Sequence, residues 1–274
     1  MKEKEPVKMS ELSPKTILVD VRDNVAWITI NRPDAMNALA RETVIEIDEA
    51  LQHLETRDDV HALVFTGQGR AFCAGGDLKY FKETVGSGDM NRFRAYLNLC
   101  QNMYRRVEAF PHPTIAAVNG VAVAGGMELI ISCDLVIAAE SAKIGDGHAN
   151  FGIIPGGGGA IRLPRKIPMA LAKRLLFTGN LLPARELADY GLVNQVVPDD
   201  QLNDAVNAML AQITKNSPLG LRLIKQLIND GYEQPLDTAL RLEVVAWESY
   251  GLSNDIKEGL QAFQDKRKPR FTGR

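Results

Sequence analysis

The sequence predicts an α/β fold followed by a helical segment, and three observations carry this prediction. Short apolar strands alternate with amphipathic helices through most of the first 195 of the 274 residues. This alternation is typical of crossover connections between parallel strands, in a sheet that helices cover. From about residue 169 onward, strand signals almost stop and helical patterns follow one another. Two glycine-rich stretches lie where a strand gives way to a helix, and glycine lets the backbone approach a ligand closely.

Five segments of the predicted core are short and apolar, and several end in turn residues, as strands do. These strands are predicted at residues 17–21, 25–30, 62–67, 114–119 and 135–138. Helices are predicted between them at 42–56 and 91–110. In the first of these, Val44, Ile47, Leu51 and Leu54 have the spacing of one buried helix face.

After the core, apolar periodicity predicts six successive helices with one candidate strand at 193–197. The helices are expected at residues 169–179, 183–190, 199–215, 217–230, 235–251 and 254–266. No Pro- or Gly-rich linker separates a core of residues 1–195 from the segment 196–274, so we expect the helices to pack on the core or on a neighbouring subunit. Their apolar positions exceed what one core covers, which predicts self-association. These positions are Leu221, Ile224, Leu227, Ile228, Leu240, Val244 and Trp247.

Composition excludes several classes of function. A net charge of −2 gives the chain no general attraction to nucleic acid. The longest apolar stretch, near residues 115–133, is interrupted by glycine, asparagine and Glu128, and it is shorter than the ~20 apolar residues that a spanning helix needs. Residues 1–5 alternate in charge without the apolar run of a signal peptide. We therefore expect a loose tail of about a dozen residues, no membrane partner and action in the cytoplasm.

The three cysteines give no sign of a metal site or a disulfide. Cys73, Cys100 and Cys133 have no CxxC spacing and stand in apolar or helical settings. No histidine is near Cys73 in the sequence, which argues against a nucleophilic thiol. The basic stretch 266–270 is either a solvated surface or a site for phosphate groups.

The two glycine junctions predict an oxyanion hole. Residues 116–129 form an apolar strand that breaks at glycines and restarts as a helix carrying Glu128. A helix N-terminus offers unsatisfied N–H groups and a positive dipole, which favour a developing negative charge. Glu128 lies one turn into that helix, followed by three apolar residues, so it is either a buried group that acts on the ligand or a complement to the helix dipole. Residues 69–79 form a similar junction and supply a second donor.

Taken together, these motifs resemble the enoyl-CoA hydratase/isomerase (crotonase) superfamily over essentially the whole chain. The segments that carry the resemblance are residues 31–39, 71–79, 117–134, 152–159, 184–193 and 258–269. The resemblance implies a spiral of ββα turns, an acyl-CoA thioester as ligand and no cofactor beyond the coenzyme A of the substrate. It also implies homotrimers or dimers of trimers, in which the C-terminal helices reach across and close the site.

The resemblance further implies roles for individual residues. The backbone N–H groups of Gly76 and Gly125 would form the oxyanion hole. Residues near the first junction would lie along the adenine and pantetheine, and two C-terminal side chains would close the nucleotide end from a neighbouring subunit. The first group is Met36, Ala38, Ala74, Asp77 and Leu78, and the second is Phe263 and Lys266.

One position departs from the hydratase pattern. Family hydratases use two glutamates, and Glu128 occupies the first position while His148 occupies the second, four residues before Gly152. Hydration needs a base for water and an acid for the α-carbon, and a histidine with an unperturbed pKa near ~6.5 can donate a proton. We therefore expect Glu128 to be the general base and His148 the acid, with Asp146 able to orient His148.

Three functions follow from this pattern. The first is an enoyl-CoA hydratase/isomerase-type enzyme that stabilises a thioester enolate and transfers a proton or water at Cα/Cβ. The second is a retro-Claisen hydrolase of cyclic β-diketones, a branch with a histidine in the same place but an acidic residue where this chain has Gly157. The third is a catalytically weakened member retained for binding acyl-CoA or protein, against which a buried Glu128 argues.

Overall fold

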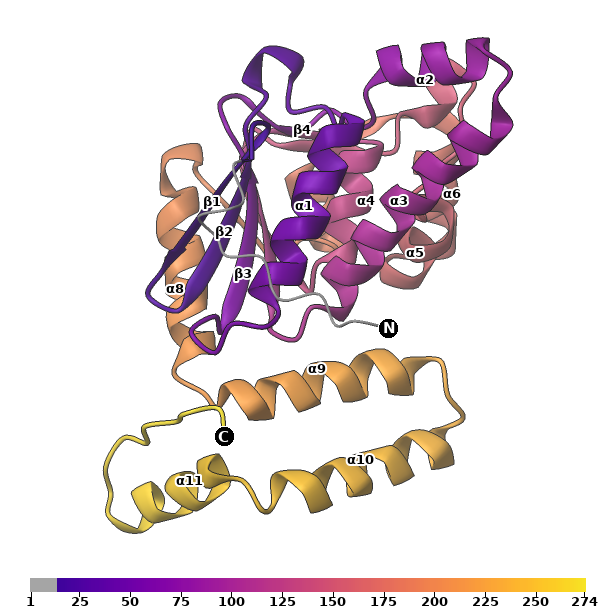
Figure 1. Ribbon diagram of the computed structural model, residues 1–274. Coiled ribbons are helices and arrows are strands. Elements are labelled where there is room, and N and C mark those ends of the chain that lie inside the picture. The colour runs from indigo at the N-terminus through magenta and orange to yellow at the C-terminus, as the bar shows by residue number, and fades with distance from the viewer. Residues whose placement is uncertain (1–13) are drawn as a thin grey trace.

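A computed structural model describes residues 14–274, so the predicted N-terminal tail lies almost entirely outside the described residues. The main sheet has six strands in the order β1-β2-β3-β5-β7-β10 (Figure 1). β1 and β2 form an antiparallel hairpin through Asp23 and Asn24, which both have positive φ, and the other neighbours are parallel. The strands are β1 (Ile17–Arg22), β2 (Val25–Ile30), β3 (Ala62–Gly67), β5 (Thr114–Val118), β7 (Leu135–Ala139) and β10 (Gln195–Val197).

A second sheet of four short strands has the order β4-β6-β8-β9. Its strands are β4 (Ala71–Cys73), β6 (Val121–Val123), β8 (Lys143–Gly145) and β9 (Leu181–Pro183). β4, β6 and β8 each follow a strand of the main sheet within a few residues, so the chain winds as a spiral of ββα turns. The fold class expected from the sequence is thereby confirmed.

The second sheet corrects one detail of the sequence prediction. We expected the stretch 116–129 to be one apolar strand that breaks at glycines and restarts as a helix, but β5 ends at Val118 and a further strand, β6, begins at Val121 in the other sheet before that helix. The corner passes through Gly120, where a β-carbon would overlap the carbonyl oxygen of Arg70. Strands of three residues are too short for periodicity to reveal, which is why β4, β6, β8 and β9 were not predicted.

Helices cover the main sheet on both faces, with α1 on one side and α8 on the other (Figure 1). Burial from both sides explains why β5 is apolar and buried along its whole length. The helices of the spiral are α1 (Arg41–Leu54), α2 (Leu78–Gly86), α3 (Met90–Ala109), α4 (Gly125–Ser132), α5 (Gly159–Lys166), α6 (Met169–Thr178), α7 (Ala184–Asp189) and α8 (Leu202–Thr214). Short 3-10 helices, η1 (Pro33–Ala35), η2 (His148–Phe151) and η3 (Asp199–Gln201), complete it.

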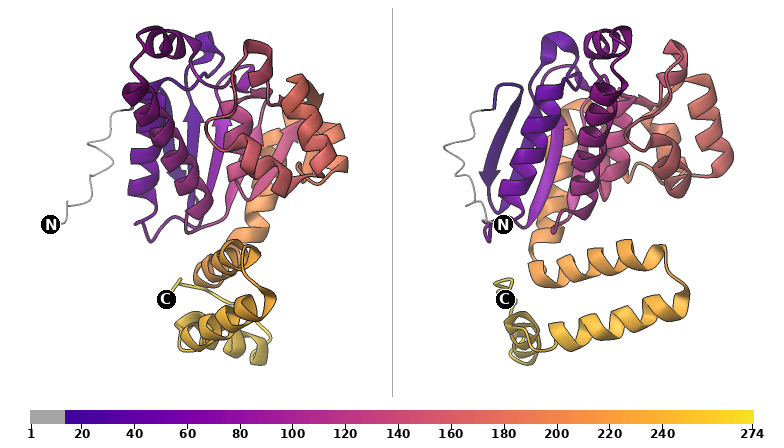
Figure 2. Two further views of the ribbon diagram at one scale, coloured as in Figure 1. Left: turned by 90° about the vertical axis from the view of Figure 1, so that its right-hand side faces the viewer. Right: turned by 45° about the vertical axis from the view of Figure 1, so that its right-hand side comes forward.

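Three further helices form a layer beyond one end of the main sheet (Figures 1 and 2). They are α9 (Pro218–Tyr232), α10 (Leu236–Tyr250) and α11 (Asn254–Gln264). α9 contacts the spiral through polar groups, because Lys225 pairs with Asp134 at 2.7 Å and the side-chain amide of Asn229 donates to the carbonyl of Glu108 at 3.2 Å. Large apolar side chains of this layer are exposed on the single chain. They include Ile224, Ile228, Leu240, Val244 and Trp247, whereas Leu221 and Leu227 are half-buried.

Candidate active site

The two glycine junctions lie side by side at the edge of the second sheet. Gly75 follows β4 with φ +91, and a β-carbon there would lie 2.8 Å from that of Ala124 and 3.3 Å from the nitrogen of Gly125. Gly126 is equally constrained, since a β-carbon would overlap the carbonyl of Cys73. The glycines of both junctions are therefore required by the close approach of the two backbones.

The first candidate oxyanion donor is the N–H of Gly76, which a short backbone bridge positions. Leu39 donates its N–H to the carbonyl of Gly75 at 2.7 Å, and the N–H of Asp77 donates to the carbonyl of Leu39 at 3.1 Å. These two bonds lie on either side of Gly76. In an extended segment, successive N–H groups point in opposite directions, so the N–H of Gly76 faces away from Leu39.

The second candidate donor is the N–H of Gly125, the first residue of α4, which has no acceptor within the helix. The preceding residue, Ala124, has φ 53 and ψ −116, a sparsely populated conformation for a residue with a side chain. The N–H of Ala124 donates to the carbonyl of Gly145 in β8 at 3.1 Å. The hydrogen bond to β8 thus fixes Ala124, whose backbone conformation sets the direction of the Gly125 N–H.

Glu128 lies one turn into α4 and is only 4% exposed. Its Oε1 accepts the N–H groups of Gly157 at 2.8 Å and Gly159 at 2.9 Å, in the turn that leads into α5. Burial raises the pKa of this carboxyl, and the two N–H bonds and the charge of His148 only partly oppose the rise. Both bonds end on Oε1 and not on Oε2.

His148 begins η2 immediately after β8 and is held by Asp146. Its Nδ1 lies 2.9 Å from Oδ1 of Asp146, and its backbone N–H donates to Oδ2 of the same carboxylate at 3.2 Å. Burial lowers the pKa of His148, but the hydrogen bond and charge of Asp146, with the charge of Glu128, outweigh burial and raise it. Because Nδ1 faces Asp146, Nε2 is the atom that can exchange a proton with a ligand.

The charge of Glu128 raises the pKa of His148, and the charge of His148 lowers that of Glu128, so the two predicted proton-transfer residues are close enough to interact electrostatically. Gly157 lies beside them and has no room for a side chain. A β-carbon on Gly157 would overlap the ring of Tyr104 and lie 2.6 Å from Oε2 of Glu128. The acidic residue of the β-diketone branch therefore does not fit this backbone.

The five residues expected along the pantetheine and adenine form a continuous strip beside Gly76. The N–H of Ala74 donates to the carbonyl of Met36 at 2.9 Å, and Arg32 donates to the carbonyl of Ala38 and pairs with Asp77 at 3.1 Å. Asp77 also caps α2 by accepting the N–H of Lys79 at 3.1 Å. Leu78, next to it, is 48% exposed. The Asp77 carboxylate thus has a structural role that the motif alone did not reveal.

The other two predicted residues, Phe263 and Lys266, are not brought to this site within one chain. Phe263 is 84% exposed on α11, and Lys266 follows that helix. α11 lies with α9 and α10 in the layer beyond the end of the main sheet (Figures 1 and 2). Any contact of these two side chains with a ligand at Gly76 must come from another subunit.

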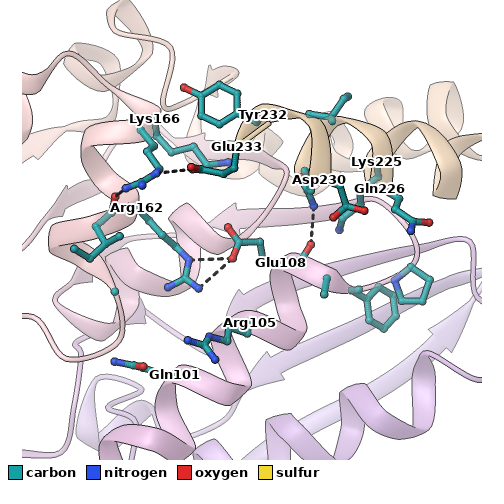
Figure 3. A pocket seen from close by; sticks show the side chains of 18 of the residues that line it. Gln101, Arg105, Glu108, Arg162, Lys166, Lys225, Gln226, Asp230, Tyr232 and Glu233 are labelled. Carbon is teal, nitrogen blue, oxygen red and sulfur yellow. Dashed lines mark hydrogen bonds and ion pairs between the residues drawn. The ribbon is translucent and has the colours of Figure 1, made fainter. Parts of the chain in front are cut away.

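A separate cavity of 1060 Å³ lies between α3, α5 and α9 (Figure 3). Arg162 on its wall pairs with Glu108 at 3.0 Å, and Arg165 pairs with Glu233 at 2.8 Å. None of the predicted site residues lines it. It separates the C-terminal layer from the spiral, and sequence patterns did not predict it because its walls come from three distant segments.

Neither the cysteines nor other possible metal ligands form a second site within residues 14–274. Cys73, Cys100 and Cys133 are buried and free, and burial raises the pKa of each thiol to about 12. Such thiols are poor nucleophiles at neutral pH. Within residues 14–274, no three His, Cys, Asp or Glu side chains are grouped so that they could hold a metal ion. In the same range, no helix has both the length and the apolar character required to cross a membrane.

Comparison with known proteins places this geometry in a family context. Residues 20–274 match the family model described as enoyl-CoA hydratase/isomerase. The chain is 38% identical to crotonyl-CoA hydratase of Syntrophomonas wolfei, over 94% of this chain and 98% of the relative. It is 37% identical to 1,2-epoxyphenylacetyl-CoA isomerase of Escherichia coli, over 94% and 98%. The crystal structure of an enoyl-CoA hydratase from Bacillus anthracis superposes with a TM-score of 0.90 at 38% identity, over 95% of this chain and 100% of that one.

Proposed function

Because the chain belongs to the enoyl-CoA hydratase/isomerase family, we propose that Glu128 and His148 are the proton-transfer pair of an enzyme of the enoyl-CoA hydratase/isomerase type. The observation that carries this proposal is the convergence of three groups. These are two backbone donors at adjacent glycine junctions, the buried carboxylate of Glu128, and an imidazole whose Nδ1 lies 2.9 Å from Asp146. Each group alone has a structural explanation, but together they supply what an enolate mechanism needs.

The oxyanion hole carries the largest share of catalysis in this proposal. The thioester carbonyl oxygen accepts the N–H groups of Gly76 and Gly125, and the negative charge that develops on it in the enolate strengthens both bonds. Each preorganised donor contributes about 2.7–4 kcal/mol to such a transition state. The dipole of α4 acts in the same direction, since Gly125 is its first residue.

Glu128 and His148 complete the hydration of an α,β-unsaturated thioester. Oε2 of Glu128 takes a proton from water as the water oxygen bonds to Cβ, and the C=C electrons move to Cα to form the enolate. Nε2 of protonated His148 then delivers a proton to Cα, and the proton on Glu128 restores the imidazolium. Asp146 favours this route because its hydrogen bond and charge raise the pKa of His148 and so favour the protonated imidazole.

The substrate proposed is an acyl-CoA thioester, with no further cofactor. The strip of Met36, Ala38, Ala74, Asp77 and Leu78 would lie along the pantetheine and adenine. A homotrimer or dimer of trimers would bring Phe263 and Lys266 of a neighbouring subunit to the nucleotide end, so the segment 196–274 would serve both assembly and closure. Action in the cytoplasm stays a prediction.

The alternative functions are less well supported. A retro-Claisen hydrolase of the β-diketone type would use His148, but the position of its acidic residue is Gly157, where a side chain would overlap Tyr104. A weakened binding member has no use for a buried carboxylate, which is costly to keep in a folded protein unless it acts.

An assay panel tests the proposal directly. The protein is offered crotonyl-CoA, a 3-enoyl-CoA and a cyclic 1,3-diketone, and product formation is followed by mass spectrometry. We expect conversion of at least one of the two thioesters and no cleavage of the diketone. Cleavage of the diketone with both thioesters unchanged would replace the proposed function by the hydrolase.

A further inference from the structure

Two buried tyrosines, Tyr96 and Tyr104, lie beside the two glycine junctions, on α3, the helix that the sequence predicted over residues 91–110. Tyr96 is 3% exposed and Tyr104 is 2% exposed. The hydroxyl of Tyr96 donates to the carbonyl of Leu39 at 3.2 Å, and the hydroxyl of Tyr104 donates to the carbonyl of Gly125 at 2.8 Å. Each phenol therefore bonds to the backbone beside one of the two candidate oxyanion donors.

The bond from Tyr96 acts on the first donor through Leu39. The carbonyl of Leu39 accepts both the Tyr96 hydroxyl and the N–H of Asp77, which is 3.1 Å away. The N–H of Leu39 donates a hydrogen bond to the carbonyl of Gly75. Tyr96 thus anchors the bridge that flanks Gly76 on both sides and fixes the direction of its N–H.

The bond from Tyr104 acts on the second donor at the start of α4. Its hydroxyl fixes the carbonyl of Gly125, the residue whose N–H is the donor, directly after the strained Ala124. The Tyr104 ring also lies where a β-carbon of Gly157 would be, so it packs against the turn whose N–H group binds Glu128. Tyr104 therefore touches the backbone of both the oxyanion hole and the proton-transfer site.

We propose that Tyr96 and Tyr104 are positioning residues, one for each donor of the oxyanion hole, and that α3 sets the spacing between the two donors. The inference rests on the proposed function, because it assigns a role only if Gly76 and Gly125 bind a thioester oxygen. Burial raises the pKa of both phenols, so each stays a hydrogen-bond donor across the working pH range. A group that holds a donor in place is worth less than the donor itself, whose loss costs about 10²–10³-fold in kcat.

The test compares Tyr96→Phe, Tyr104→Phe and the double variant with a matched control. Thr66→Val is the control, since it removes a hydroxyl that donates at 3.0 Å to the carbonyl of Ala117 in β5 of the main sheet, and not to the backbone beside Gly76 or Gly125. Melting temperature measures the general cost of losing one such bond. Turnover of the substrate found in the assay panel gives kcat and KM, and acetoacetyl-CoA reports on the hole itself, because its enolate absorbs in the near ultraviolet.

We expect each tyrosine variant to lower kcat by about tenfold with little change in KM, because the lost interaction matters mainly in the transition state. The fraction of bound acetoacetyl-CoA that is present as the enolate should also fall in each tyrosine variant. Thr66→Val should lose a similar amount of melting temperature but keep kcat and the enolate fraction within about twofold of wild type. Wild-type values of kcat and enolate fraction in both tyrosine variants would overturn the inference. A wild-type protein that binds acetoacetyl-CoA without forming enolate would instead overturn the proposed function.

Discussion

At the scale of single residues, the proposed site differs from a two-glutamate hydratase in the group that would supply the second proton. His148 occupies that place with Asp146 behind it, 2.9 Å from its Nδ1. A carboxylic acid in the same position must be held protonated to donate, whereas an imidazolium donates from its ordinary charged state. In the proposed mechanism, the Asp146–His148 pair would therefore supply the acid with an imidazolium in place of a carboxylic acid.

Replacing Glu128 by glutamine keeps the shape of the side chain and removes the proton acceptor. Turnover should fall by about 10²–10⁴-fold, with little change in the affinity for the thioester. Steady-state kinetics and calorimetry with the substrate check the two parts. A Glu128→Gln protein with undiminished kcat would assign the base to another residue.

Two substitutions of His148 separate the acid from a bystander. His148→Ala should lower kcat by a factor similar to that of the glutamate change, about 10²–10⁴. His148→Glu should restore or raise the hydration of crotonyl-CoA, because it recreates the two-carboxylate arrangement. Full activity of His148→Ala on the true substrate would leave Glu128 alone as the proton-transfer residue and favour isomerisation over hydration.

The pH profile depends on Asp146. In the proposed mechanism, Glu128 must be deprotonated, which would set the acidic limb, and His148 must be protonated, which would set the basic limb. Asp146 raises the pKa of His148, so Asp146→Asn should shift the basic limb of kcat/KM to lower pH. The acidic limb should move far less, and a variant whose basic limb stays in place would remove Asp146 from the mechanism.

At the scale of elements, the turn between η2 and α5 binds the carboxylate of Glu128, which is carried by α4. The N–H groups of Gly157 and Gly159 bind Glu128, while the Tyr104 ring from α3 packs against the same turn. Three elements that are distant in sequence thus hold one carboxyl group. The packing explains the glycine at position 157, where a β-carbon would overlap the Tyr104 ring, and a β-carbon at Gly159 would approach Oε1 of Glu128 to 3.2 Å.

Gly157→Ala tests this packing. Its β-carbon would overlap the Tyr104 ring and approach Oε2 of Glu128 to 2.6 Å. Overpacking of this kind costs about 1–3 kcal/mol of stability, and the displaced Glu128 should lower kcat as well. Gly86→Ala in α2 is the control, because a β-carbon there has open space, and it should leave both stability and kcat close to wild type. Gly191→Ala is less suitable as a control, because the positive φ of Gly191 would itself strain an alanine. An unchanged melting temperature in Gly157→Ala would show that the turn relaxes freely.

At the scale of the whole molecule, the C-terminal layer exposes more apolar surface than a monomer normally keeps. Trp247, Val244 and Ile228 are 57%, 59% and 63% exposed, and they belong to two adjacent helices. Burial of such a face between copies of the chain is the ordinary solution. We expect light scattering at micromolar concentration to give an assembly of three or six chains, and a stable species of 30.1 kDa would contradict this.

The sequence by itself determined the α/β class, the main strands and most helices, because these depend on apolar periodicity that neighbouring residues carry. It also identified Glu128 and both glycine junctions as candidates, since their motifs are contiguous, whereas His148 became a candidate only through the resemblance to the family pattern. Only the tertiary structure decided what lies between them: the second sheet, whose strands are too short to have a period, and the bonds from Tyr96 and Tyr104. A tyrosine on a buried helix face has the same local pattern whether it fills a core or fixes a backbone carbonyl. The partner that distinguishes these roles is up to 57 residues away in the chain, where no local pattern extends.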